Sequence, residues 1–443
     1  MTKNCHPKYN KWMHYFALLT AIGTLLLLGL GGLVTSHEAG MSVPDWPNTY
    51  GYNMFLFPIA KWVGGVFYEH THRLLASVVG LLTVALAVWF WRRDPRAWLR
   101  RLGLAAVALV LVQGVLGGLR VRWHMDNLGI FHGTAAQLFF ILVCALGLWT
   151  SRWWWQADEA TWPSAPAGLR SLVLAATALI FAQLILGATM RHQHAGLAIR
   201  DFPLAHGKLW PDTSVAAVAR YNANRMEVMS ENPITAAQII LQMIHRLAAR
   251  AILLAVGTTA WLARRQLGAR TVLARLAAVW LGLILVQIGL GIATLYTNKA
   301  ADIATLHVLV GALVLATGAL WCVIAFRRPA QAHPVSTSVA PPSPAAGSAP
   351  YKPLAVSNRW RSVLRLQTTA GVPQTSQSAV SRVSQPADRP LNGRTRLLSS
   401  LPIGKSAIQQ VGKPAVRTGK MPRCRVGSRT VPVRGALHTA VLS

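Results

Sequence analysis

The chain has 443 residues, of which 53% are hydrophobic and 13% are charged. With 17 tryptophans, this composition is typical of a polytopic membrane protein and argues against a soluble enzyme. The net charge of +31 does not indicate nucleic-acid binding, because 16 Lys or Arg residues lie in residues 329–443 with one acid, Asp388, and no basic motif or folded basic face is visible.

Eight apolar runs are long enough to cross a bilayer, which takes roughly 20 residues in each span. The first follows Lys3, Lys8 and Lys11, is too long for the apolar part of a signal peptide and lacks a clear cleavage site. We therefore expect it to be retained as the first helix. The predicted spans are residues 14–36, 66–91, 98–120, 128–150, 169–190, 236–263, 269–296 and 302–327.

Basic residues predict the orientation of these spans, because cytoplasmic loops of membrane proteins are enriched in Lys and Arg. The N-terminal lysines and the arginines that follow the second, sixth and eighth runs all fall on one side. We predict a multi-pass protein of the cell (inner) membrane with both termini in the cytoplasm. The arginines are Arg92, Arg93, Arg96, Arg100, Arg101, Arg264, Arg265, Arg270, Arg327 and Arg328.

Motifs in the first half recur in the second half in the same order. An even number of spans per repeat gives both halves one orientation, so the pattern predicts two pseudo-symmetric four-helix bundles in an all-α polytopic fold. The matches are Gly31, Ala39-Gly40 and Asp45-Trp46-Pro47 with Gly187, Ala195-Gly196 and Asp201-Phe202-Pro203; His72-Arg73 with His245-Arg246; Gln113 and Gly117 with Gln287 and Gly291; and His132 with His307.

The predicted domains follow from this repeat. Residues 1–155 form the N-terminal bundle and residues 156–328 form the C-terminal bundle. Residues 329–443 are dominated by Pro, Ser, Ala, Arg and Gln without periodicity, which predicts a disordered basic tail. This tail either binds anionic lipid headgroups or is dispensable.

Four histidines are candidate metal ligands: His72, His132, His245 and His307. Each lies roughly five residues into its span, about 7–8 Å below the outer end. A single histidine in a membrane helix often only bonds a neighbour, but four in repeated positions predict two sites in which paired imidazoles hold haem iron. Zinc or copper is less favoured, because cysteine and carboxylate co-ligands are missing.

Charged residues next to these histidines suggest how the two sites differ. Arg73 and Arg246 are candidates to bind haem propionates, and the alternative is that they extend to the membrane interface. Glu69 lies one helical turn before His72, where the second half has Gln242. This mismatch predicts a reacting first site and a second site that only holds a cofactor, unless Glu69 merely stabilises the start of its helix.

The remaining histidines near the outer face are expected to be solvated or interfacial. They are His37, His70, His124, His192, His194 and His206.

Taken together, these residues resemble the haem A synthase family over about residues 12–328. The resemblance rests on Ala39-Gly40-Met41 with Pro44-Asp45-Trp46-Pro47, on Glu69-x-x-His72-Arg73, and on His132, His245-Arg246 and His307. It implies two pseudo-symmetric four-helix bundles and the conversion of haem O to haem A, in which a ring methyl becomes a formyl group by successive hydroxylations and loss of water.

The resemblance also implies roles for the candidate residues and partners. His72 and His132 would flank the iron of the substrate haem O, His245 and His307 would ligate a haem b, and Glu69 would be catalytic. The expected partners are membrane lipid, the protohaem farnesyltransferase that makes haem O, and the assembly factors of the terminal oxidases that use haem A. A homo-oligomer is compatible with the sequence.

One departure from the family and two other functions bear on this interpretation. Many bacterial members carry a cysteine pair in an outer loop, but this sequence has Val43 before Pro44 and no outer-loop cysteine, so we expect no disulfide-linked role. A quinol-linked di-haem b electron-transfer protein would explain the four histidines but not Glu69. A haem carrier without catalysis is the third hypothesis.

Overall fold

The computed structural model describes residues 9–156, 162, 164–225 and 233–327, and the chain in these ranges is mainly helical. Eight of its helices are long and apolar enough to cross a membrane. The predicted all-α polytopic fold is therefore confirmed. The eight helices are α1 (Lys11–Ser36), α2 (Gly65–Arg93), α3 (Ala97–Arg122), α4 (Asp126–Thr150), α6 (Ala167–His192), α8 (Ala236–Leu267), α9 (Val272–Tyr296) and α10 (Ala301–Ala325).

Side-chain caps and one glycine fix several helix ends. The Asn10 side chain accepts the first amides of α1, and Thr235 forms a capping box with Gln238 at the start of α8. Gly268, with φ of 86°, ends α8, and Thr271 caps α9. The predicted boundary at residues 263–269 was therefore wrong by three to four residues, because the arginines after the apolar run continue the helix until Gly268.

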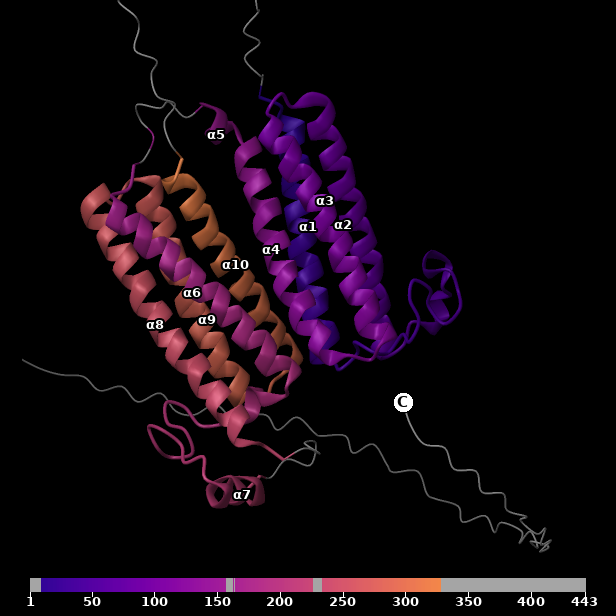
Figure 1. Ribbon diagram of the computed structural model, residues 1–443, viewed down its shortest axis with the longest axis vertical. Helices are drawn as coiled ribbons and strands as arrows, with labels where there is room; N and C mark the ends of the chain where they lie inside the picture. Colours follow the sequence, from indigo (N-terminus) through magenta and orange to yellow (C-terminus); the bar gives the residue numbers. More distant parts are fainter. Residues whose placement is uncertain (1–8, 157–161, 163, 226–232, 328–443) are drawn as a thin grey trace, which may run out of the picture. The chain divides into compact units, whose positions relative to one another are not determined.

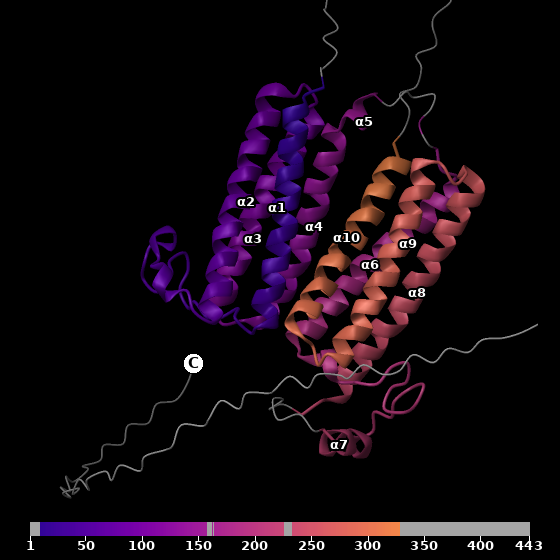
Figure 2. The same ribbon diagram turned by 180° about the vertical axis from the view of Figure 1, so that it is seen from behind.

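The long helices pack as two groups of four with the same order of neighbours (Figures 1 and 2). In the first group α1 contacts α2 and α4, and α3 contacts α2 and α4. In the second group α6 contacts α8 and α10, and α9 contacts α8 and α10. This arrangement is compatible with the predicted pseudo-symmetry, and the domain boundaries at residues 155 and 328 stay a prediction. The tail predicted for residues 329–443 lies outside the described residues.

Helices α1, α4, α6 and α10 join the two bundles. Near the ends of α1 and α6 that the sequence predicts to face outward, called the outer ends from here on, Nη2 of Arg191 donates to the carbonyl of Gly32 at 2.5 Å and to Oγ of Ser36 at 2.6 Å. Ser36 also lies 3.3 Å from the Thr305 hydroxyl on α10. A half-buried guanidinium thus ties the end of the first helix of one repeat to the end of the first helix of the other.

Aromatic side chains and glycines fill the centre of each bundle. Trp280 and Trp321 are fully buried, and their indole N–H groups donate to the carbonyls of Val314 and Leu273 at 2.9 and 3.0 Å. Such partners are needed in the membrane interior, where water cannot satisfy a polar group. Gly318 lies directly against Trp280, as is common for small residues between membrane helices.

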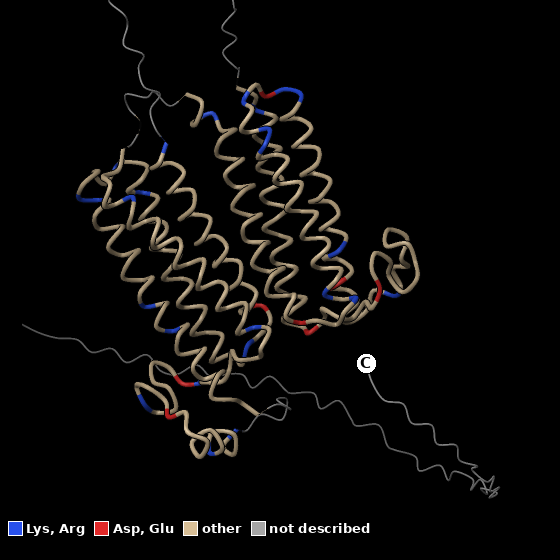
Figure 3. Tube along the Cα trace, viewed as in Figure 1, with Lys and Arg blue, Asp and Glu red and all other residues tan. Residues whose placement is uncertain are grey.

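Charged residues lie mostly near the helix ends, and few lie in the apolar middle (Figure 3). The outer connections contain short elements: the 3-10 helices η1 (Met54–Leu56), η2 (Ile59–Lys61) and η4 (Ala195–Leu197), and helix α7 (Val215–Ala223). At the opposite end, α5 (Arg152–Gln156) follows α4. The sequence patterns did not predict these five elements.

Candidate functional site

The four candidate ligands lie on α2, α4, α8 and α10, near the outer end of each helix. His132 and His307 each lie six residues after the first residue of their helix, whereas His72 lies seven and His245 nine residues after theirs. The expected depth of roughly five residues is close for His132 and His307, whereas His245 lies four residues deeper, because α8 begins earliest relative to its histidine.

The structure brings these histidines together in the two expected pairs. The imidazoles of His72 and His132 lie near enough to interact electrostatically, and so do those of His245 and His307. In all four rings Nδ1 is buried. A backbone carbonyl of the neighbouring helix approaches three of these rings: Leu27 for His72, Gln113 for His132 and Gln287 for His307. Imidazoles are costly to bury in apolar bundles unless they are partnered, so this repeated arrangement suggests that each pair is built around a ligand.

A glycine on the neighbouring helix receives the edge of each imidazole. A Cβ atom added at Gly31 would lie 3.1 Å from Cε1 of His72. The equivalent distances are 3.3 Å for Gly117 and His132, 3.5 Å for Gly187 and His245, and 3.2 Å for Gly291 and His307. The repeated glycines of the sequence therefore line the candidate site, and their recurrence in both halves, at offsets of 156 and 174 residues, was the signal that could have identified them.

The residues present fit a haem better than a metal held by protein alone. Over the described ranges no three His, Cys, Asp or Glu side chains come together. Structural and catalytic zinc sites use three or four protein ligands, whereas haem iron takes only its axial ligands from the protein. Two buried imidazoles from different helices of one bundle fit that requirement. Gln113, on the same face of α3 as Gly117, adds a buried amide whose oxygen and nitrogen are both unpartnered within the described residues.

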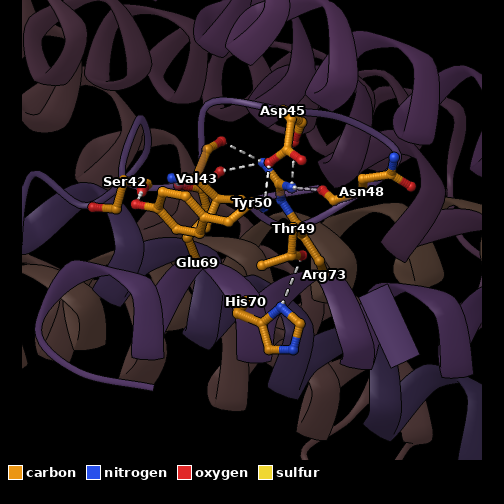
Figure 4. A network of polar contacts seen from close by, with 9 residues as sticks. All are labelled: Ser42, Val43, Asp45, Asn48, Thr49, Tyr50, Glu69, His70 and Arg73. Carbon is orange, nitrogen blue, oxygen red and sulfur yellow. Dashed lines mark hydrogen bonds and ion pairs between the residues drawn. The ribbon is translucent and has the colours of Figure 1, made fainter. Parts of the chain in front are cut away.

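Glu69 and Arg73 connect α2 to the outer loop that follows α1 (Figure 4). The Glu69 carboxylate accepts the amide of Val43 at 2.8 Å through Oε2 and a guanidinium N–H of Arg73 at 2.7 Å through Oε1. Arg73 also donates to the carbonyls of Val43, Asp45 and Asn48 at 2.9, 2.7 and 3.1 Å. A carboxylate and three carbonyls thus surround this guanidinium, and contact with a propionate stays a prediction.

We call the contacts of Glu69 and Arg73 with the loop that follows α1 a latch. The second half repeats this latch, with the amide of Gln242 in place of the carboxylate. Gln242 accepts the amide of Ile199 through Oε1 at 2.6 Å, as Glu69 accepts that of Val43. Its Nε2 donates to the carbonyls of Gly196 and Ile199. Gln242 therefore preserves the loop and removes the charge. Arg246 donates to the carbonyls equivalent to those bound by Arg73, which belong to Ile199, Asp201 and Leu204.

Each latched loop contains a turn held by an aspartate. The two carboxylate oxygens of Asp45 accept the amides of Tyr50 and Gly51 at 2.7 and 2.8 Å. Burial alone would raise the pKa of Asp45, but these amides and the charge of Arg73 outweigh it and lower the pKa below its ordinary value of 3.8. Asp201 makes the equivalent bonds to residues 206 and 207.

His70 was wrongly expected to be solvated or interfacial. Its side chain is fully buried beneath the first outer loop, where Nδ1 lies 3.2 Å from the Thr49 hydroxyl and the ring contacts Phe57 and Trp62. The loop folds back over α2 because Arg73 holds it there, which no local pattern around His70 indicates. The second half has a buried Met243 at this position.

Comparison with known proteins places this architecture in a family. The family model COX15-CtaA, described as a cytochrome oxidase assembly protein, matches residues 14–318. The chain is 26% identical to a haem A synthase of Halalkalibacterium halodurans over 68% of this chain and 93% of that protein. It is 29% identical to one of Sphingopyxis alaskensis, over 70% and 89%, and 32% identical to one of Methylobacterium nodulans, over 58% and 70%. Because the family match covers more than half of the chain, the protein belongs to the COX15-CtaA family of cytochrome oxidase assembly proteins.

Proposed function

We propose that this protein is a haem A synthase, a membrane oxidoreductase that converts haem O to haem A. The observation that carries the proposal is the difference between two otherwise repeated latches. The first histidine pair has a buried carboxylate one helical turn away at Glu69, and the second has the neutral amide of Gln242. Relatives that the chain matches over most of their length are haem A synthases.

The two histidine pairs take different haems in this proposal. His72 and His132 bind the iron of the substrate haem O from its two faces. His245 and His307 hold a haem b, which supplies one-electron redox chemistry when bound. The glycines that face the four rings leave room for the imidazoles, and this room is tightest at Gly31, Gly117 and Gly291, where an added Cβ atom would lie 3.1–3.3 Å from the ring.

Glu69 is the proposed catalytic residue. Two successive hydroxylations of one ring methyl, each a two-electron oxidation by an external oxidant, give a hydrated carbonyl, and loss of water gives the formyl group. A buried carboxylate near the macrocycle can accept or return the protons of these steps. The Val43 amide and Arg73 hold its two oxygens in fixed positions, so the outer loop orients the carboxylate and covers it from solvent.

The similarity of the two halves is also compatible with two alternative functions. Two equivalent histidine pairs, each with its facing glycines, would also serve a quinol-linked di-haem b electron-transfer protein. A haem carrier without catalysis needs the same ligands. Neither alternative gives a reason for a buried carboxylate in the first half alone.

The proposal extends to location and partners. The eight spans make the protein multi-pass, and the basic residues at one end of the helices support an inner-membrane location with cytoplasmic termini. Haem O arrives from a protohaem farnesyltransferase through the lipid phase, and haem A leaves to oxidase assembly factors. Arg73 and Arg246 hold the outer loops, and any contact with haem propionates is additional to that role.

Coexpression with a haem O synthase tests the proposal, in a host that makes no haem A. Chromatography and mass spectrometry of extracted haems should reveal haem A only when this chain is present. Cells that accumulate haem O and no haem A would overturn the enzymatic assignment, and haem b recovered with the purified protein would then favour the electron-transfer alternative.

A further inference from the structure

Arg120, near the outer end of α3, is a mostly buried cation with incomplete hydrogen bonding. Its side chain is 15% exposed, and its ion pair is with Asp126 at 3.3 Å, a carboxylate that is itself 60% exposed. Its Nε is buried and has no partner in the described part of the chain. By contrast, the terminal nitrogens of Arg73 bind a carboxylate and three carbonyls. The guanidinium of Arg120 therefore retains donors for a further acceptor.

The position of Arg120 relates it to the first histidine pair. It lies three residues after Gly117, so it shares the face of α3 that meets His132 and lies about one turn nearer the outer end. Its charge is felt by His72, His132 and Glu69. The guanidinium therefore lies within electrostatic range of the ligand pair and of the proposed catalytic carboxylate, and also of His192 on α6.

A glycine in the outer loop makes room for this guanidinium. A Cβ atom added at Gly40 would lie 2.8 and 2.9 Å from the two terminal nitrogens of Arg120, which is closer than real contacts allow. Gly40 belongs to the loop that Arg73 holds on α2. The absence of a side chain at Gly40 thus leaves space for the guanidinium of Arg120 beside the first histidine pair.

The second half has no arginine at the equivalent place. The offset that relates Gln113 to Gln287 and Gly117 to Gly291 relates Arg120 to Thr294. Thr294 donates its hydroxyl to the carbonyl of Leu290 within α9. At this position the guanidinium is therefore a feature of the first half alone, as the carboxylate of Glu69 is. The charge of Arg191 reaches His307 in the second half, but Arg191 already donates to Gly32 and Ser36.

We propose that Arg120 binds a carboxylate of the substrate, namely a propionate of the porphyrin held by His72 and His132. A guanidinium presents paired N–H donors that match a carboxylate, and such charge-assisted bonds are strong when desolvated. The inference rests on the proposed function, because it takes the first site to be the substrate site. The inference adds to that function a basis for substrate recognition, because the first site would select the propionate-bearing edge of the macrocycle.

This contact would also orient the substrate in its plane. Two axial imidazoles leave a macrocycle free to rotate about the axis between them. A bond between Arg120 and one propionate removes that freedom and fixes which part of the rim approaches Glu69. The residue thus acts as a positioning residue, and its loss would scramble orientation as well as weaken binding.

A titration with two forms of one probe isolates the proposed contact. Purified protein is titrated with iron protoporphyrin IX and with its dimethyl ester, in which both propionates are uncharged. The binding component that His72→Ala removes reports the first site. The wild type should prefer the free acid by about 10- to 100-fold, as expected for a hydrogen bond between charged groups. Arg120→Gln should lose most of this preference while binding the ester like the wild type.

Two further variants complete the test. Arg122→Gln changes an exposed arginine two residues along the same helix and should keep the full preference. Arg120→Lys keeps the charge and should restore part of it, which a purely structural role would not predict. An unchanged preference in Arg120→Gln, or equal affinity of the wild type for acid and ester, would overturn the proposal. Failure of the proposed function appears separately, as the absence of haem A from the coexpression extracts of the wild type.

Discussion

The carboxylate of Glu69 lies 2.7 Å from the guanidinium of Arg73, one turn further along α2. Both side chains are at least nine-tenths buried. Arg73 therefore compensates the charge of Glu69 and holds the outer loop through three carbonyls. In the second half Arg246 donates its hydrogen bonds to three carbonyls, and Gln242, which stands in place of Glu69, carries no charge to pair with it. The two halves share one latch and differ in whether it contains an ion pair.

Replacing Arg73 in the first half should therefore lower the stability of the fold more than replacing Arg246 in the second half. Arg73→Gln leaves Glu69 buried without its counter-ion, a change worth about 3–5 kcal/mol. Arg246→Gln removes hydrogen bonds to carbonyls, worth roughly 1–3 kcal/mol in total. Thermal unfolding in detergent should show the larger loss of stability for Arg73→Gln. Equal losses would contradict the role of the ion pair.

The glycines that face the histidines give a graded prediction. Gly31→Ala places a Cβ 3.1 Å from the His72 ring, so the ring must shift, whereas at Gly187 the distance to His245 is an ordinary 3.5 Å. Alanine favours a helix over glycine by roughly 0.5–1 kcal/mol, so the helices themselves should not weaken. Gly31→Ala should lower haem occupancy of the first site several-fold, measured by absorbance, and Gly187→Ala should leave the second site filled. Normal occupancy in Gly31→Ala would contradict the steric role.

Much of the fold could be predicted because apolar length decides where membrane helices lie. The runs at 98–120 and 128–150 fall within α3 and α4, since little besides hydropathy determines those spans. The ends were less predictable. Arg264 and Arg265 interrupt the apolar run but continue α8, because the helix ends where Gly268 adopts a positive φ. The short elements between residues 54 and 61 depend on contacts that hold the loop against α2.

The candidate site was predictable where residues repeat and unpredictable where they depend on tertiary contacts. The pairing of His72 with His132 followed from the repeat and from helix direction. The burial of His70 and the hydrogen bonds of Arg73 to loop carbonyls could not be predicted in this way, because both depend on how residues 43–62 fold back over α2. Arg120 was missed because it has no counterpart in the second half, and repetition was the signal that drew attention to the other residues.

The division of roles between the histidine pairs predicts different haem losses. His245→Ala removes one axial ligand of the proposed haem b and should abolish haem b in the purified protein. His72→Ala should keep haem b and lose haem O. Pyridine haemochrome spectra and chromatography of extracted haems measure both. The opposite pattern, with haem b lost only in His72→Ala, would mean that the two histidine pairs have the reverse of the proposed roles.

The Asp45 turn predicts how the first outer loop responds to acid. The folded pKa of Asp45 lies below 3.8, despite burial, owing to the Gly51 and Tyr50 amides and Arg73. A group with a lowered folded pKa stabilises the fold above its unfolded pKa and loses that contribution as the pH falls through the folded value. Asp45→Asn should therefore speed pepsin cleavage of the loop at pH about 5, and the difference from the wild type should vanish well below pH 3.8. Equal cleavage at pH about 5 would contradict the turn's role.

The most direct measurement compares the haems extracted from the wild type and from Glu69→Gln, each coexpressed with a haem O synthase. The chain itself indicates that glutamine keeps the latch, because Gln242 accepts the same loop amide. Glu38→Gln, which removes an exposed carboxylate near the same loop, is the matched control and should form haem A normally. Glu69→Gln should retain haem b and haem O and form no haem A. Normal haem A formation by Glu69→Gln would contradict the account.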